Sequence, residues 1–154
     1  HLTTLFPEVR LKGYIELRSA DSQGPELALA LPAIAKGVYY DDSALAAAWD
    51  LVKGWSWETR LELQRDVPRQ GLQERVGRHR LADFARELLE IAEYGLRRAR
   101  DLDAGGQDET VYLARLVDEV RHGRCPADRV REKWLGEWNQ QPRALVEGTM
   151  YGQP

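Results

Sequence analysis

The sequence predicts an α+β fold, with one strand or short hairpin at the start and about six helices after it. Residues 7–17 alternate between apolar and polar side chains, which is the period of a strand with one buried face. After Pro25, apolar residues recur at the three- and four-residue spacing of amphipathic helices. With 154 residues, of which 43% are hydrophobic, the chain has enough apolar material for one compact core.

The first segment has one apolar and one polar set of side chains. The apolar set is Pro7, Val9, Leu11, Gly13, Ile15 and Leu17, and the polar set is Glu8, Arg10, Lys12, Tyr14, Glu16 and Arg18. Gly13 indicates a bulge or a turn, so two short strands are as good a reading as one long strand. An apolar strand face needs partner strands, which this chain does not supply, and we therefore expect a fragment of a larger domain. A hairpin folded about Gly13 weakens that argument.

The helices are expected from apolar spacing and from capping and stop signals. The expected segments are 27–38, restarted at Pro32; 42–54, capped by Asp42 or Ser43, with the stripe Leu45, Trp49 and Val52; 57–68, stopped by Pro68; 80–102; 108–122; and a last helix from Pro126 that carries Trp134 and Trp138. The segment 80–102 has the clearest periodicity. The five tryptophans all lie on or beside apolar stripes, which favours core packing over a binding groove.

Composition excludes some classes of partner. A net charge of -3 and a pI near 5.7 argue against nucleic acid and against an anionic membrane surface, because such binders carry a basic excess. No apolar run approaches the roughly 20 residues that span a bilayer. Cys125 is the single cysteine and cannot form an internal disulfide, so we expect a cytoplasmic location.

The polar face of the first segment could carry chemistry. Side chains two residues apart on a strand lie side by side, so Glu16 and Arg18 face the same space, and Arg10 joins them if the register holds. A carboxylate can bind Mg²⁺, and an arginine can bind a carboxylate or phosphate through two hydrogen bonds. The same residues also fit a solvated strand face with ordinary ion pairs. Spacing alone favours the solvated face, and periodicity does not establish a site.

Three stretches of sequence resemble a known family. They are HLTTLFPEVRLKGYIELRSAD at the start, ALPAIAKGVYYDD after it and CPADRVREKWLGEWNQ near the end. They are similar to sequences of glutamate-cysteine ligases of the plant and proteobacterial type, within the wider carboxylate-amine ligase family. The resemblance covers essentially the whole chain, and it is thin between about Arg60 and Asp108.

The resemblance implies the C-terminal part of a glutamine-synthetase-like catalytic domain, in which an antiparallel sheet surrounds ATP, Mg²⁺ and L-glutamate. Residues 1–154 would form one fragment, with an active-site strand region at 1–21 and a helical layer with C-terminal helices at 25–154. The implied reaction joins L-glutamate to L-cysteine at the expense of ATP, the first step of glutathione biosynthesis. We expect the fragment alone to be inactive, because the upstream part of the domain must complete the site.

The resemblance also assigns roles. Glu16 matches a Mg²⁺ ligand, and Arg18 matches a catalytic arginine that contacts the transferred phosphoryl group or the glutamate. Arg10 matches a substrate-binding arginine. Related ligases use other amines, so the acceptor stays open. A helical interaction or regulatory module without catalysis remains the alternative from another class.

Overall fold

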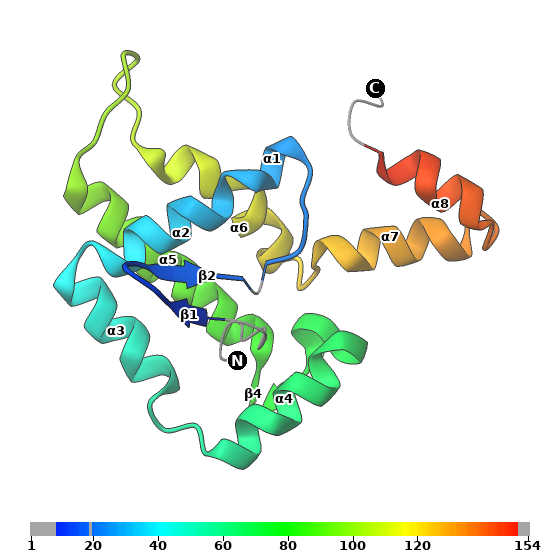
Figure 1. The fold of residues 1–154 in the computed structure, drawn as a ribbon, viewed down its shortest axis with the longest axis horizontal. Helices are drawn as coiled ribbons and strands as arrows, with labels where there is room; N and C mark the ends of the chain where they lie inside the picture. Colours follow the sequence, from blue (N-terminus) through cyan, green and yellow to red (C-terminus); the bar gives the residue numbers. More distant parts are fainter. Residues whose placement is uncertain (1–8, 19, 151–154) are drawn as a thin grey trace.

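The computed structural model describes residues 9–18 and 20–150, and it shows a small hairpin followed by a layer of helices (Figure 1). The α+β class expected from the sequence is confirmed. The elements are β1 (Val9–Leu11), β2 (Ile15–Leu17), α1 (Pro25–Ala28), α2 (Ala30–Tyr39), α3 (Asp42–Val52), α4 (Trp57–Gln70), the 3₁₀ turn Gly71–Gln73, β3 (Arg75–Val76), β4 (His79–Arg80), α5 (Leu81–Ala99), the 3₁₀ turn Glu109–Leu113, α6 (Ala114–Arg121), α7 (Pro126–Leu135) and α8 (Pro142–Thr149).

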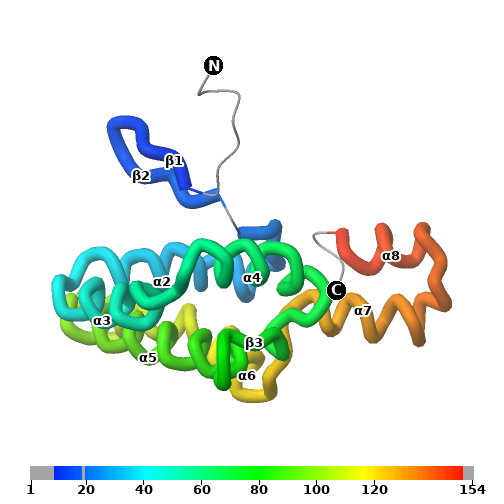
Figure 2. The backbone as a smooth tube through the Cα atoms, turned by 90° about the horizontal axis from the view of Figure 1, so that it is seen from below, coloured from blue at the N-terminus to red at the C-terminus, as the bar shows by residue number. Residues whose placement is uncertain are grey.

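The first segment is a hairpin folded about Gly13, which was one of the two readings of its sequence. β1 and β2 pair antiparallel, and the backbone N–H of Lys12 donates to the carbonyl of Tyr14 at 2.8 Å across the turn. The expected start of the strand at Pro7 lies outside the described residues. Figure 2 shows the hairpin standing off one side of the helical layer.

The helical layer is built on a close crossing of α2 and α5. The core there consists of Ala30, Ala33, Val38, Ala92, Leu96 and Leu113. At the crossing point, a Cβ added at Gly95 would overlap the carbonyl oxygen of Gly37, and one added at Gly37 would overlap the carbonyl of Ala92. The two backbones therefore touch where side chains would normally separate them.

Helix α3 packs through its small residues, and the stripe expected from the sequence was wrong. Ala44 is buried, whereas Leu45 and Trp49 are exposed. The N-cap is Asp41, one residue before the expected caps, and its carboxylate accepts from the N–H of Ala44 at 2.9 Å. Because α3 lies close to α5, alanine fits the contact and the larger side chains point outward.

Helix α4 does not stop at Pro68, as the sequence suggested, but continues to Gln70. Proline's fixed φ is itself helical, so a proline in the last turn removes one hydrogen bond without ending the helix there. The expectation of core tryptophans was also wrong for Trp57, which is 68% exposed. Trp55, just before α4, does pack, with its ring edge-to-face on Phe84 of α5 at 5.2 Å between centroids.

In the C-terminal third, the helices differ from the expected ones at their ends. The segment 108–122 begins as a 3₁₀ turn and becomes α-helical only at Ala114. Helix α7 ends at Leu135, so Trp138 lies beyond it and packs against Gly148 of α8, a helix that the sequence did not reveal. Among the described residues, no helix has both the length and the apolar character needed to cross a membrane.

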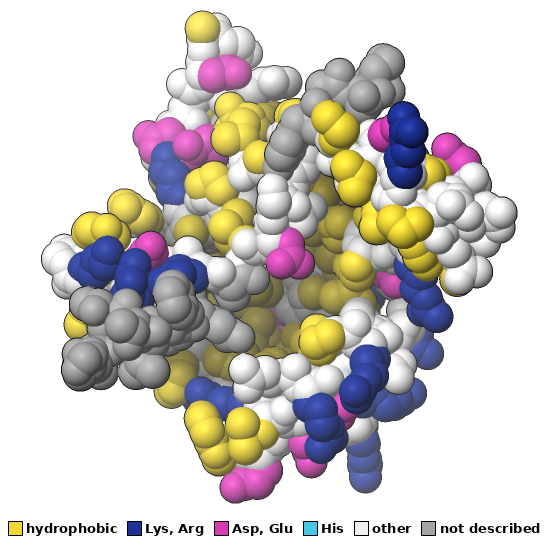
Figure 3. Space-filling view, turned by 45° about the vertical axis from the view of Figure 1, so that its right-hand side comes forward, with side chains coloured by type: hydrophobic (Ala, Val, Ile, Leu, Met, Phe, Trp, Pro, Cys, Tyr) yellow, Lys and Arg dark blue, Asp and Glu magenta, His cyan; other side chains and the backbone are white. Residues whose placement is uncertain are grey.

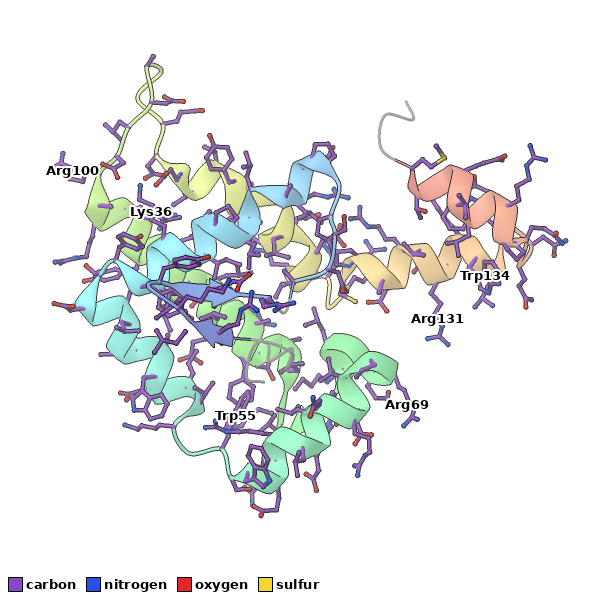
Figure 4. All side chains as sticks on the ribbon, viewed as in Figure 1. Lys36, Trp55, Arg69, Arg100, Arg131 and Trp134 are labelled. Carbon is purple, nitrogen blue, oxygen red and sulfur yellow. The ribbon has the colours of Figure 1, made fainter. Side chains whose placement is uncertain are left out.

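Ion pairs join these helices at their ends. Lys36 of α2 donates to Asp101 and pairs with Glu109, both at 2.6 Å, which ties α2 to the loop that follows Arg100 (Figure 4). At the other end of the layer, the buried Oε1 of Glu119 pairs with Arg115 at 3.1 Å and with Arg129 at 3.0 Å. The second pair fixes the start of α7 to α6.

Because α2 and α5 touch at Gly95, one added methyl group there should lower the stability of the fold strongly. We expect Gly95→Ala to lower the free energy of unfolding by about 3 kcal/mol, because the added Cβ forces the two helices apart. Denaturant unfolding of the chain, followed by circular dichroism, measures this. Gly54→Ala is the control, since a Cβ there meets nothing within 4 Å. Equal stability of the two variants would contradict the crossing as described.

Candidate functional site

The polar face of the β1–β2 hairpin brings together residues that the sequence placed on one side of a strand. The register pairs Val9 with Leu17, Arg10 with Glu16 and Leu11 with Ile15. Direct cross-strand partners point to the same side of a hairpin. Arg10 and Glu16 are therefore opposite each other, and not merely on the same face.

The Arg10 guanidinium holds one oxygen of the Glu16 carboxylate. Its Nε donates to Oε2 at 2.7 Å, and its Nη2 lies 2.6 Å from the same atom. Both side chains are partly covered. A charge-assisted contact of this length is among the stronger hydrogen bonds of a protein surface. It fixes the position of the carboxylate relative to the strand backbone.

Positive charge around Glu16 keeps its carboxylate ionised. The hydrogen bond from Arg10 lowers the pKa of Glu16 below its ordinary value, and the charges of Arg10, Lys12 and Arg18 act in the same direction. Partial burial opposes this effect. The face thus presents a stable anion within a cationic surrounding, which suits binding of a metal-phosphate group.

Lys12 belongs to this face, although the sequence analysis gave it no role. Its Nζ lies 4.0 Å from Oε2 of Glu16. The signal was present, because Lys12 occupies an even position of the same alternation. Arg18 lies one residue beyond β2, and its charge also lowers the pKa of Glu16.

A magnesium ion can take only part of its ligand set from this hairpin. Within the part of the chain that the structure describes, no group of three or more His, Cys, Asp or Glu side chains could hold a metal ion. Mg²⁺ sites on enzymes that bind nucleotides commonly use one or two carboxylates and complete the shell with phosphate oxygens and water. The ionised Glu16 fits as one such ligand.

The other face of the hairpin is apolar and exposed. Leu11 is 82% exposed, and Val9 and Ile15 are also exposed. A two-stranded hairpin with an uncovered apolar face is marginally stable alone. In space-filling view, further hydrophobic side chains gather around a hollow beside the helical layer (Figure 3). The exposed side chains of Val9, Leu11 and Ile15 favour further protein packing against this face of the hairpin.

The lone cysteine and the helix-end histidine show no catalytic arrangement. Burial raises the pKa of the Cys125 thiol, and the nearby Asp128 acts in the same direction, so the thiol stays protonated. His122 ends α6, and its Nδ1 lies 2.8 Å from the carbonyl oxygen of Asp118.

The structure thus defines an α+β chain whose hairpin carries a paired carboxylate and guanidinium ahead of a helical layer. A family model described as glutamate-cysteine ligase family 2 (GCS2) matches residues 1–148. The chain belongs to this family.

Curated relatives agree with the family model. Glutamate-cysteine ligase, chloroplastic, from Arabidopsis thaliana is 38% identical over 151 residues, and those from Solanum lycopersicum and Nicotiana tabacum are each 35% identical. Each of these matches covers 98% of the chain and 28% of the relative. The chain therefore spans a little over a quarter of the length of the relatives that it matches.

The Arg10–Glu16 pair predicts a change in titration. We expect Arg10→Gln to raise the pKa of Glu16 toward its ordinary value, because the largest cause of its lowering is removed. The stability that the pair gives the hairpin is present above the unfolded pKa of Glu16 and is lost as pH falls through the lower folded value. The Glu16 side-chain carboxyl ¹³C shift, followed by NMR against pH, measures both midpoints.

Arg98→Gln is the matched control, since Arg98 pairs with Asp41 at 2.8 Å on another part of the surface. It should leave the Glu16 titration unchanged. An identical Glu16 midpoint in the native chain and in Arg10→Gln would mean that the pair does not form in solution.

Proposed function

We propose that this chain is the C-terminal part of an ATP-dependent glutamate-cysteine ligase. The observation that carries the proposal is the hairpin face on which Arg10 pairs with Glu16, in a chain whose family and curated relatives bear that name. In the proposed reaction, ATP transfers its terminal phosphoryl group to the γ-carboxylate of L-glutamate, which releases ADP. The amine of L-cysteine then attacks the acyl phosphate, forms the amide and releases phosphate.

The residues of the face have separate proposed roles. Glu16 is a ligand of Mg²⁺, which when bound offsets the negative charge of the phosphate groups. Arg18 contacts the transferred phosphoryl group or the glutamate, where a guanidinium stabilises charge that develops during transfer. Arg10 binds substrate and also holds Glu16 in place, as the 2.7 Å hydrogen bond supports.

Other parts of the enzyme must complete this site. Glu16 is a single carboxylate, and the apolar face of the hairpin is uncovered. Both features support an upstream part of the same catalytic domain as the partner of this chain. A reducing compartment such as the cytoplasm suits the reaction, because the thiol of the cysteine substrate stays reduced there.

The first test measures phosphate release by the full-length protein with ATP, Mg²⁺, L-glutamate and L-cysteine. We expect Glu16→Gln and Arg18→Ala each to lower turnover by about a hundredfold or more, a size typical for loss of one charge-stabilising group. Glu90→Gln and Arg60→Ala, at exposed helix positions, should retain activity. Turnover indifferent to Glu16→Gln and Arg18→Ala would refute the assigned roles.

The second test asks which amine is the acceptor and whether the 154-residue chain is active alone. Supplying other amino acids in place of L-cysteine should give little phosphate release if cysteine is the acceptor. The 154-residue chain alone should release none, because it supplies one carboxylate of the metal site. No turnover by the full-length protein with any amine would favour a helical module without catalysis.

A further inference from the structure

Two exposed turns, far apart in the sequence, meet on the side of the helical layer opposite to the β1–β2 hairpin (Figure 2). One is the β3–β4 hairpin, which carries Arg75, Arg78 and Arg80. The other is the turn between α6 and α7; Arg121 is the last residue of α6, and Arg124 lies in the turn itself. We call these five residues the arginine turns.

The side chain of Gln73 joins the two turns. Its Oε1 accepts from the guanidinium of Arg80 at 3.2 Å, and its Nε2 donates to the carbonyl of Gly123 at 2.8 Å. Gly123 has a φ of +64°, and a Cβ there would lie 3.2 Å from Nε2 of Gln73. The two turns that carry the arginines are therefore held next to each other by direct contacts.

Arg75 and Arg80 are an unfavourable pair. They are direct cross-strand partners, a position in which like charges destabilise a hairpin. The turn between them, Gly77–Arg78, adds a third cation, with Gly77 at a φ of +60° as two-residue hairpin turns require. A tight turn thus holds three guanidinium groups together at a cost in stability.

None of these three guanidinium groups forms an ion pair with a carboxylate of the described residues. The guanidinium of Arg75 donates to the carbonyl of Arg78 at 3.4 Å, and that of Arg80 donates to the neutral amide of Gln73. The nearby Glu74 and Asp83 accept from the backbone N–H groups of Arg75 and Arg80.

Several arginines elsewhere on the surface do have such partners, whereas the exposed Arg60, Arg100 and Arg131 form no ion pair with the described residues. Arg65 pairs with Asp66, Arg97 with Glu93 and Arg98 with Asp41. None of the five arginines of these turns forms an ion pair with any described residue. The β3–β4 hairpin differs from the sites of those single arginines because it groups Arg75, Arg78 and Arg80 within six residues. This grouping suits a counter-charge from outside the described part of the chain.

We propose that the arginine turns bind an acidic segment of another polypeptide. Guanidinium groups match carboxylates in shape and charge. Nucleic acid is disfavoured because the ring at this hairpin, His79, packs on Phe84 and is not free to stack on a base. A membrane is disfavoured because residues 71–80 and 121–125 include no exposed large hydrophobic side chain.

The test uses the full-length protein and a fluorescein-labelled peptide of eight consecutive glutamates, with binding read as anisotropy at low salt. We expect the double variant Arg75→Gln/Arg80→Gln to weaken binding about tenfold or more, and Arg121→Gln/Arg124→Gln to weaken it similarly, since each removes two cations. The control Arg65→Gln/Arg97→Gln, which removes two arginines with internal partners, should bind as the native protein does.

A second readout separates binding from folding. Removal of the Arg75–Arg80 repulsion should leave the melting temperature of the first variant equal to or above that of the native protein. A variant with Arg75→Glu/Arg80→Glu should bind an octalysine peptide instead. The proposal is overturned by no peptide binding, by equal loss in the control, or by tighter binding of duplex DNA or phosphatidylserine vesicles than of the peptide.

Discussion

The direct contact of α2 with α5 at Gly37 and Gly95 sets the position of everything else in the helical layer. With the two backbones touching, α3 must pack through alanine, and Lys36 is near enough to reach both Asp101 and Glu109. Since α2 directly follows α1 and the hairpin in the chain, the same crossing determines where the hairpin leaves the layer. The site therefore depends on two glycines that carry no chemistry.

The sequence predicts the parts of the fold that are governed by local periodicity. Segment 80–102 is found as α5, and the interruption at Gly13 is found as a turn. The prediction from periodicity fails in α3, where small residues make the contact. Leu45 and Trp49 are more hydrophobic than the alanines, so the pattern assigns the buried face to them. It also fails for β3 and β4, which are two residues each and too short for any pattern to show.

The candidate site is predictable in its members but not in its geometry. Alternation alone places Arg10, Glu16 and Arg18 on one face, and the resemblance to ligases supplies the roles proposed for them. The sequence does not reveal that Arg10 and Glu16 are cross-strand partners, because the register follows from the length of the turn. For the same reason, Lys12 is placed beside Glu16 only once the turn is known.

The separation of the hairpin from the helical layer has a consequence for synthesis of the protein. Residues 9–17 leave the ribosome before α5 exists, and two three-residue strands do not hold a structure on their own. The main contacts of the helical layer join elements within residues 25–122. A chain still on the ribosome can therefore close the helical layer only once the residues of α5 and α6 have emerged, long after the residues of the hairpin.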